Sequence, residues 1–312
     1  MNNVDLHVFA TVAESGGIGR AASQLNTVQS NVTARMRALE TELGVPLFYR
    51  HSRGVVLTAA GERLLPYAKR IGALLLEARQ AVAEGPVPSG ALRIGSLETT
   101  AAMRLPPILM AYTRAYPKVD LQIDTGPTDG LLDKVLQRDI EGAFVTGPVA
   151  HPELVAVPVV QEELVLVTAP DCGPDGRALR GRDRASGADN KTEPKILVFR
   201  SGCSYRQKLE AMLAADTGGG APVRRLEFGT LDGILGCVSA GLGITLLPRA
   251  VAAPTAAAGQ VALHALPDRS GFTWTVFVRR RDGFLSSALA RFIECAVETH
   301  ANAQAATAQE AA

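Results

Sequence analysis

The sequence predicts an α/β protein of three parts: a small helical N-terminal domain, one long helix, and a larger domain of alternating strands and helices. Apolar residues recur at helical spacing up to Leu43, and a heptad-like apolar pattern then runs from Thr58 to Val82. Beyond Gly90, short β-type runs alternate with amphipathic segments. At 312 residues the chain is long enough for more than one domain.

The N-terminal part predicts three short helices and a hairpin. The expected helices are Val4–Ala13, Ile18–Leu25 and Gln29–Leu43, separated by a Gly16-Gly17 break and a tight turn at Asn26-Thr27. In the third helix Val32, Met36 and Leu39 share one face, and polar residues occupy the other. Two short helices joined by a tight turn form a helix-turn-helix pattern. The following LFYRHSRGVVLT predicts two short strands, which would form a wing.

The sequence predicts a long helix from Thr58 to about Val82, and we expect this helix to pair with a second copy in a dimer. Its apolar positions alternate spacings of four and three, as in a coiled coil: Leu64, Ala68, Ile71, Leu75, Ala78 and Val82. Pro66 interrupts the backbone hydrogen bonding and predicts a kink. The run from Gly85 to Gly90 reads as a linker.

The third part predicts mostly parallel sheets with flanking helices, because strands and helices alternate along it. The polar run Asp171–Glu193 is expected to be an irregular surface loop, and residues 301–312 a disordered tail.

Composition excludes several classes of protein. With 47% hydrophobic and 20% charged residues the chain is typical of soluble globular proteins, and no apolar run approaches about eighteen residues. The N-terminus resembles no secretory signal, so we expect the cytoplasm, at the nucleoid, and no membrane contact. A net charge of +1 permits only a local basic face. Four widely spaced cysteines argue against a zinc site or a disulfide scaffold, and we expect neither metal nor cofactor.

The stretch SNVTARMRALETELGVPLFYRHSRGVVLTAAGERLL closely resembles the signature of LysR-type transcriptional regulators, and the resemblance extends over roughly residues 1–300. It implies a winged helix-turn-helix at 1–58, a linker and dimerisation helix at 59–88, and an effector-binding domain at 89–300. This last domain would be similar to type 2 periplasmic binding proteins, with one subdomain at about 91–166 and 267–300 and another at about 167–266. VFRSGCSYRQKLE is most similar to the branch that contains glutamate-responsive regulators.

The resemblance implies double-stranded promoter DNA as a partner, RNA polymerase for an activator, and homodimers that assemble into homotetramers. The candidate DNA-binding residues lie on the polar face of the third helix and in the wing: Gln29, Ser30, Asn31, Thr33, Arg35, Arg37, Arg50 and Arg53. Gln29 suits an adenine edge, and Arg37 a guanine or a phosphate. Taken alone, this face is equally typical of a solvated helix surface. Val28 stands where the family usually carries Ser or Thr, so either Thr27 caps the helix or its first turn is looser.

The resemblance also implies an effector cleft between the subdomains, at the carboxyl ends of parallel strands where helix N-termini point. Thr99 matches a position at which family members bind effector. The candidate residues are Ser96, Thr99, Thr100, Gly126, Thr128, Thr146, Ser201, Cys203, Ser204, Tyr205 and Arg206. Each hydroxyl is as typical of an ordinary helix cap. Because the cleft holds an arginine among hydroxyls, we expect a small organic or amino acid, anionic in charge.

Two alternatives remain open at this stage. Cys203 lies in the turn where the peroxide-sensing branch keeps its reactive cysteine, which leaves a thiol-based redox regulator possible; here, however, the matching spacing to Arg206 falls on Ser204. A cytoplasmic solute-binding protein would explain residues 91–300 but not the first 58. An enzyme is not expected, since the sequence has no P-loop, GxGxxG, HExxH or GxSxG motif.

Overall fold

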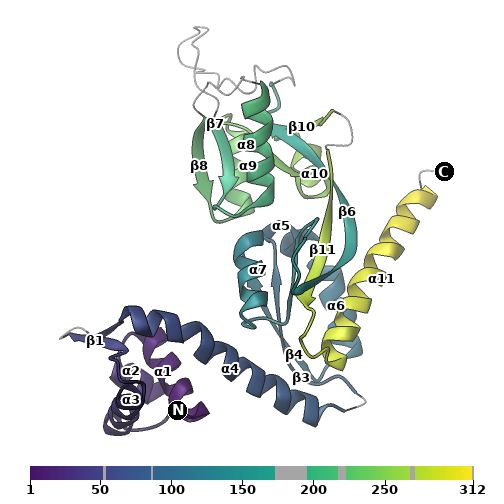
Figure 1. Ribbon diagram of the computed structural model, residues 1–312. Helices are drawn as coiled ribbons and strands as arrows, with labels where there is room; N and C mark the ends of the chain where they lie inside the picture. The colour runs from purple at the N-terminus through teal and green to yellow at the C-terminus, as the bar shows by residue number, and fades with distance from the viewer. Residues whose placement is uncertain (52–53, 86, 173–194, 217–222, 268–270, 311–312) are drawn as a thin grey trace. The chain divides into compact units, whose positions relative to one another are not determined.

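The computed structural model describes residues 1–51, 54–85, 87–172, 195–216, 223–267 and 271–310 (Figure 1). The chain divides into two compact units. The first unit comprises Met1–Glu84 together with Gln137–Asp139, and the second comprises Gly85–Leu136 and Ile140–Ala312. None of the helices in the described ranges is long and apolar enough to cross a membrane.

The first unit is a three-helix head with a hairpin and one long helix, as the sequence predicts. Its elements are α1 (Asn3–Ser15), α2 (Ile18–Gln24), α3 (Gln29–Leu43), β1 (Phe48–His51), β2 (Gly54–Leu57) and α4 (Ala59–Ala83). Phe9 and Val12 of α1 are fully buried, as are Val32, Met36 and Leu39 of α3, so the apolar faces of the helices meet in one core. β1 and β2 pair antiparallel, from Phe48 opposite Leu57 to His51 opposite Gly54.

A short polar junction fixes the start of α4 against the hairpin. The Thr58 hydroxyl caps the helix by accepting from the Gly61 amide at 3.1 Å, and it donates to the Pro46 carbonyl at 2.7 Å. Gly61 lies directly against the Leu47 carbonyl, where a Cβ atom would come within 2.3 Å of the oxygen. Only glycine fits at this contact.

α4 continues through Pro66 as one helix of 25 residues. Its N-terminal half packs on the head through Leu64, Ala68 and Ile71. The apolar residues of its C-terminal half are instead exposed: Leu74, Leu75, Leu76 and Val82.

The second unit contains nine strands and seven helices within the described ranges. The strands are β3 (Gly90–Ser96), β4 (Val119–Thr125), β5 (Gly142–Thr146), β6 (Leu154–Thr168), β7 (Lys195–Phe199), β8 (Arg224–Phe228), β9 (Thr245–Pro248), β10 (Ala262–Ala265) and β11 (Phe272–Arg280). The helices are α5 (Glu98–Met103), α6 (Leu105–Ala115), α7 (Thr128–Leu136), α8 (Ser204–Asp216), α9 (Leu231–Ser239), α10 (Arg249–Ala257) and α11 (Ser287–Glu310).

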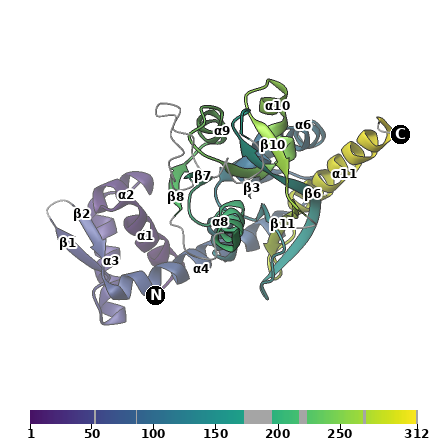
Figure 2. The same cartoon turned by 90° about the horizontal axis from the view of Figure 1, so that it is seen from above.

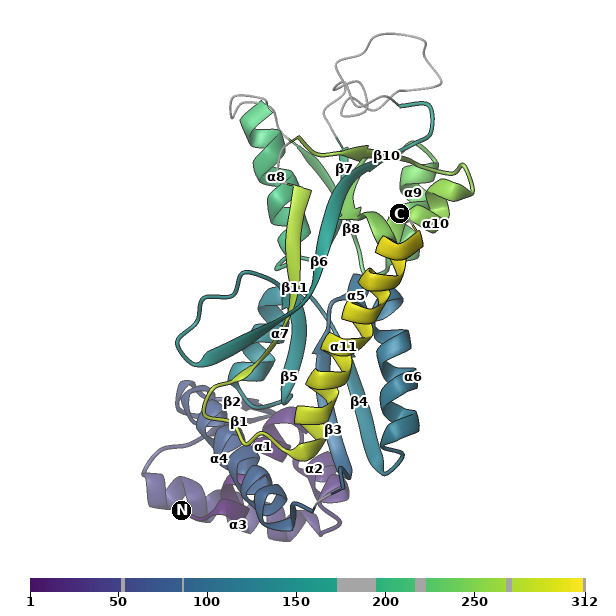
Figure 3. The same cartoon turned by 90° about the vertical axis from the view of Figure 1, so that its right-hand side faces the viewer.

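The main sheet is mixed, so the expectation of mostly parallel sheets is wrong for it. Its order is β10-β6-β11-β5-β3-β4, with β9 also paired to β6. β3 is parallel to β4 and β5, but β11 is antiparallel to β5 and β6, and β6 is antiparallel to β9 and β10. The reason is connectivity: β6 leads the chain out of one half of the unit and β11 brings it back, so the two run in opposite directions (Figure 3).

These two strands join two lobes. Lobe I contains β3, β4, β5, α5, α6, α7 and α11, and lobe II contains β7, β8, β9, β10, α8, α9 and α10. Within lobe I, Phe144 faces α6 and α11, whereas its neighbours Ala143 and Val145 face α7.

Lobe II has the same layered construction around β7, which pairs in parallel with β8. Ile196 and Val198 of β7 pack on the α8 side, and Leu197 between them packs on the α9 side. Figure 2 shows α8 and α9 on opposite sides of these strands. Strands buried on both faces are expected wherever helices cover a parallel pair.

Two expected irregular segments have different outcomes. The backbone of α11 is helical to Glu310, so a helix occupies most of the segment that was expected to be a disordered tail. The expected loop Asp171–Glu193 lies almost wholly outside the described residues.

Replacing Tyr112 by phenylalanine should lower the free energy of unfolding by about 1–2 kcal/mol. Tyr112 is fully buried, and its hydroxyl donates to the Ala288 carbonyl at 2.8 Å, joining α6 to the start of α11. Burial also raises the pKa of this phenol, so it remains a donor at all physiological pH values. Urea unfolding measures the change.

The control is Tyr116→Phe, since Tyr116 contacts the same core but its hydroxyl has no hydrogen bond within the described residues. Equal losses from the two variants would contradict the role given to the Tyr112 hydroxyl.

Candidate functional site

The polar face of α3 is presented to solvent. Gln29, Ser30, Asn31 and Arg37 are exposed, and Thr33 is half-buried with its hydroxyl donating to the Gln29 carbonyl at 2.8 Å. A helix in this position, with polar and basic side chains outward, has the form of a major-groove reading helix.

The first turn of α3 has no side-chain cap. Val28 is the N-cap residue and makes no capping hydrogen bond. The Thr27 hydroxyl does not cap the helix either, because it accepts from the Asn31 side-chain amide at 3.0 Å. Of the two expected consequences of Val28, the structure therefore favours the uncapped first turn.

The predicted arginines of the head differ in their partners. Arg35 is held by Asp5 of α1 at 2.9 Å, and Arg50 by Glu40 at 3.1 Å. Arg37 is exposed and forms no ion pair with any residue that the structure describes. Arg53 lies outside the described residues. Arg37 is thus the α3 arginine whose charge is most available to a nucleic acid.

A concave surface of about 420 Å³ lies between the α1–α2 turn and the hairpin, and two of its basic residues were not predicted. Arg20 and His51 line it together with Arg50. The Val55 amide donates to the Gly16 carbonyl at 3.2 Å, and a Cβ on Gly54 would come within 2.5 Å of the same oxygen. The sequence signal for these residues was only their proximity to the glycines of the turn and the wing.

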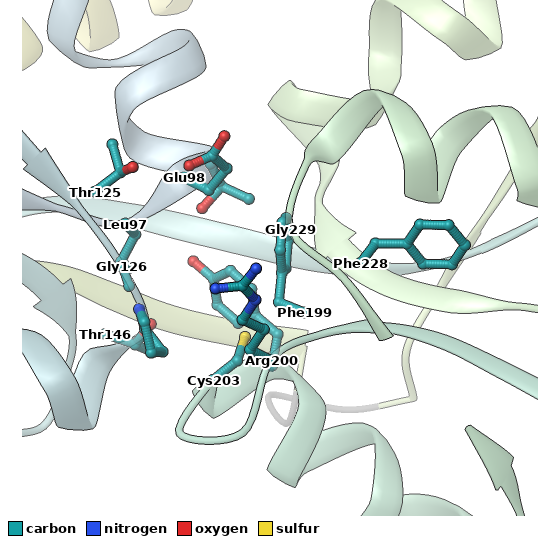
Figure 4. A pocket seen from close by; sticks show the side chains of 13 residues that line it. Leu97, Glu98, Thr125, Gly126, Thr146, Phe199, Arg200, Cys203, Phe228 and Gly229 are labelled. Atoms are coloured by element: carbon teal, nitrogen blue, oxygen red, sulfur yellow. The ribbon is translucent and has the colours of Figure 1, made fainter. Parts of the chain in front are cut away.

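A cavity of about 220 Å³ lies between the two lobes of the second unit (Figure 4). Its walls are the residues that follow β3, β4 and β5 in lobe I and β7 and β8 in lobe II, so it lies at the carboxyl ends of parallel strands. The lining residues are Leu97, Glu98, Thr99, Thr125, Gly126, Pro127, Thr146, Phe199, Arg200, Cys203, Tyr205, Phe228 and Gly229.

Part of the predicted effector set lines this cavity. The residues that do so are Thr99, Gly126, Thr146, Cys203 and Tyr205. Ser96, Thr100, Thr128, Ser201, Ser204 and Arg206 are not among the lining residues. Ser96 and Thr100 are buried inside lobe I, and the Ser96 hydroxyl donates to the Leu97 carbonyl at 3.1 Å.

Two of the remaining hydroxyls join the lobes directly. Ser204 of lobe II donates to the Thr128 hydroxyl of lobe I at 3.1 Å. Beside this contact the Asp129 amide donates to the Gly202 carbonyl at 3.4 Å. These residues therefore hold one edge of the cavity together.

Tyr205 reaches from lobe II to the hydroxyls of lobe I. Its side chain lies close enough to the Thr146 and Thr99 hydroxyls for both to lower its pKa, and it is almost fully buried. Burial raises the pKa of the phenol to about 12, against the smaller opposing effect of the two hydroxyls. Tyr205 is consequently a neutral hydrogen-bond donor at physiological pH.

The cation of the cavity is Arg200 rather than the predicted Arg206. Arg206 is bound by Glu210 at 3.1 Å and by Glu227 at 2.7 Å, which fixes it between α8 and β8. Arg200 follows the end of β7 and lines the cavity. The sequence analysis did not select Arg200, although its position directly after a predicted strand was a signal that could have identified it.

Glu98 is a second lining residue that the sequence reasoning missed. It is half-buried at the start of α5, beside Thr99. Within the described residues neither Glu98 nor Arg200 has an ion-pair or side-chain hydrogen-bond partner. The cavity thus contains one acidic and one basic group whose charges the surrounding protein leaves uncompensated.

Cys203 is buried, and its burial raises the pKa of the thiol despite the opposing backbone amides of Arg206 and Tyr205. All four cysteines are free thiols. A thiol that stays protonated reacts slowly with peroxide, so the environment of Cys203 argues against the redox-sensing alternative.

Comparisons with known proteins agree with this two-unit organisation. Residues 4–62 match the family model of the bacterial regulatory helix-turn-helix protein, lysR family, and residues 86–301 match the LysR substrate binding domain. GltR, an HTH-type transcriptional regulator of Bacillus subtilis, is 44% identical over 94% of this chain and 95% of its own length. YusT, an uncharacterized regulator of the same species, is 46% identical over 94% of this chain and 95% of its own length.

The crystal structure of full-length CbnR complexed with its target DNA has the same fold. The match has a TM-score of 0.64 at 24% identity, and it covers 96% of this chain and all of CbnR (100%). The head therefore binds DNA through its helix-turn-helix, and the second unit is an effector-binding domain rather than an enzyme. The chain belongs to the LysR family of bacterial transcriptional regulators.

Proposed function

We propose that this regulator reads promoter DNA with the exposed face of α3 and the β1–β2 hairpin, and that it responds to a small organic or amino acid bound in the interlobe cavity. The observation that carries the proposal is the cavity itself. It combines an uncompensated arginine with buried hydroxyls at the meeting point of two lobes, in a chain whose other unit is a DNA-binding head.

At the DNA end, Gln29 and Arg37 are the residues suited to base edges, and Ser30 and Thr33 are short donors for phosphates. Arg50 and Arg53 of the hairpin would contact flanking phosphates, with Arg50 first releasing Glu40. Arg35 would act through Asp5, by holding α3 on α1.

Assembly would use α4. The exposed leucines of its C-terminal half provide an apolar seam for a second α4, and a homodimer would place two heads on a two-fold symmetric site. Two dimers would form a tetramer that bends the DNA between its sites, and an activator of this kind would present the bent complex to RNA polymerase.

Effector binding would act on the lobe–lobe contacts. The Tyr205 phenol interacts with the Thr99 and Thr146 hydroxyls across the cavity, so a bound acid would compete with the phenol for these hydroxyls or interact with all three groups. Either change alters how the lobes pack, and β6 and β11 are the strands through which the lobes would bend.

Replacing Arg37 by alanine should weaken specific DNA binding by about 1–3 kcal/mol, because it removes an exposed guanidinium from the proposed reading face. The fold should be unaffected, since Arg37 forms no ion pair among the residues that the structure describes. Fluorescence anisotropy with a DNA site selected from a random pool by the wild-type protein measures the loss. If Arg37 binds the DNA phosphate backbone, the plot of log affinity against log salt concentration should become less steep, by the contribution of about one phosphate contact.

The matched variant is Arg35→Ala, which removes the ion pair with Asp5 and should affect the thermal stability of the head more than DNA affinity. Unchanged DNA affinity in Arg37→Ala, at wild-type stability, would contradict the proposed reading face.

Thr99→Val should retain DNA binding but lose the thermal shift and the change in DNA affinity that effector produces. Valine keeps the shape of the buried threonine and removes the hydroxyl that faces the cavity. The experiment is a thermal-shift screen of organic and amino acids on the full-length protein, followed by DNA binding with the compounds that shift it.

Thr113→Val is the control, since Thr113 is exposed on α6 and its hydroxyl bonds only to the Leu109 carbonyl among the described residues. A full effector response in Thr99→Val would place the effector elsewhere.

A further inference from the structure

We infer that the interlobe cavity selects a zwitterion, an α-amino acid whose ammonium group pairs with Glu98 and whose carboxylate pairs with Arg200. This inference rests on the proposed function, because it takes the cavity as the effector site. It narrows the effector from any small organic or amino acid to one that carries both charges.

The first observation is the position of the two charged residues. Glu98 comes from lobe I, as the first residue of α5, and Arg200 comes from lobe II, directly after β7. Figure 4 shows them on different walls of the same cavity, with the labelled Thr146 and Cys203 beside Arg200. A ligand that meets both must bridge the lobes.

The second observation is that neither residue is neutralised within the protein. Some arginines of the second unit have carboxylate partners: Arg104 binds Glu162 through two hydrogen bonds of 2.9 and 2.7 Å, and Arg249 binds Glu163 at 2.6 and 2.8 Å. Others, such as Arg93 and Arg114, have none among the described residues, but these do not line the cavity. Arg200 instead lies over Gly229, where its guanidinium nitrogen is 3.5 Å from the position that a Cβ would occupy. Across the described residues neither Glu98 nor Arg200 forms an ion pair.

The electrostatic consequence separates ligand classes. A carboxylate without an ammonium group would satisfy Arg200 but bring a second negative charge towards Glu98, and closure would leave Glu98 desolvated and unpaired. An amine without a carboxylate would pair with Glu98 but leave Arg200 without an anionic partner. A zwitterion compensates both groups at once, and charge complementarity of this kind gives specificity.

The rest of the lining is neutral and suits such a ligand. The Tyr205 phenol stays protonated, and with Thr99 and Thr146 it supplies hydrogen bonds without adding charge. The volume of about 220 Å³ is below that of typical drug-sized sites, which favours a small metabolite. Leu97, Pro127 and Phe199 provide apolar surface for the side chain of the amino acid.

The test is a binding comparison on the full-length protein. The twenty standard L-amino acids are screened by thermal shift and calorimetry, each beside the 2-hydroxy acid and the primary amine with the same side chain. The expected result is that at least one amino acid binds, and that its hydroxy acid and amine bind at least about tenfold more weakly.

Variants assign the two charges. Glu98→Gln should weaken binding of the amino acid by about tenfold or more without changing binding of the hydroxy acid. The protein should then no longer distinguish the two ligands. Arg200→Gln should weaken both ligands. Glu294→Gln, an exposed helix carboxylate paired with Arg291 on α11, is the charge-matched control and should bind like wild type.

The outcomes separate this inference from the proposed function. A hydroxy acid that binds as tightly as its amino acid, with Glu98→Gln unchanged and Arg200→Gln impaired, would overturn the zwitterion and leave an anion sensor. No shift from any of the three series, with a shift from another organic acid, would likewise overturn the zwitterion alone. Binding that is insensitive to Glu98, Arg200 and Thr99 alike would overturn both.

Discussion

The hydrogen-bonded ladder between β6 and β11 carries both lobes of the effector-binding domain. β6 is one strand of 15 residues whose first part pairs with β11 beside the lobe I strands and whose last residues pair with β9 and β10 in lobe II. Main-chain hydrogen bonds hold these strands in register. The two lobes can therefore change their relative orientation only where the two strands bend or twist. Within the described chain the ladder supplies no lining residue to the cavity, yet it sets the distance between the two walls.

Carboxylates neutralise several arginines of the chain, but not the two that lie on the proposed functional surfaces. Those that hold secondary-structure elements together have carboxylate partners, as Arg35 has on α1 and Arg206 has on α8 and β8. Arg37 and Arg200 have no such partner in the part of the chain that the structure describes. An arginine without an internal partner is free to bind an external anion, and these two lie on the helix proposed to read DNA and in the cavity proposed to bind effector.

The hydroxyl residues of the domain divide in a similar way. Thr99 and Thr146 line the cavity beside Tyr205, whereas Thr128 and Ser204 hydrogen-bond to each other across the lobes. In the proposed function, sensing and coupling would therefore be performed by neighbouring residues of similar chemistry. Tyr205 is the residue next to Ser204 in the chain. A ligand that binds Tyr205 would therefore act close to the Ser204–Thr128 contact between the lobes, and could change how the lobes pack.

The sequence by itself determined the elements, the order of the domains and the family. Helical spacing of Val32, Met36 and Leu39, the strand runs and the long signature are local properties, and local periodicity specifies an element before it has neighbours. Tertiary structure decided which side chains remained free for function. Arg206 meets Glu227 across 21 residues of sequence and Arg35 meets Asp5 across 30, so no local pattern distinguishes them from Arg200 and Arg37. The mixed sheet and the pairing of Thr128 with Ser204 were hidden for the same reason: they depend on contacts between distant segments, which only the folded chain brings together.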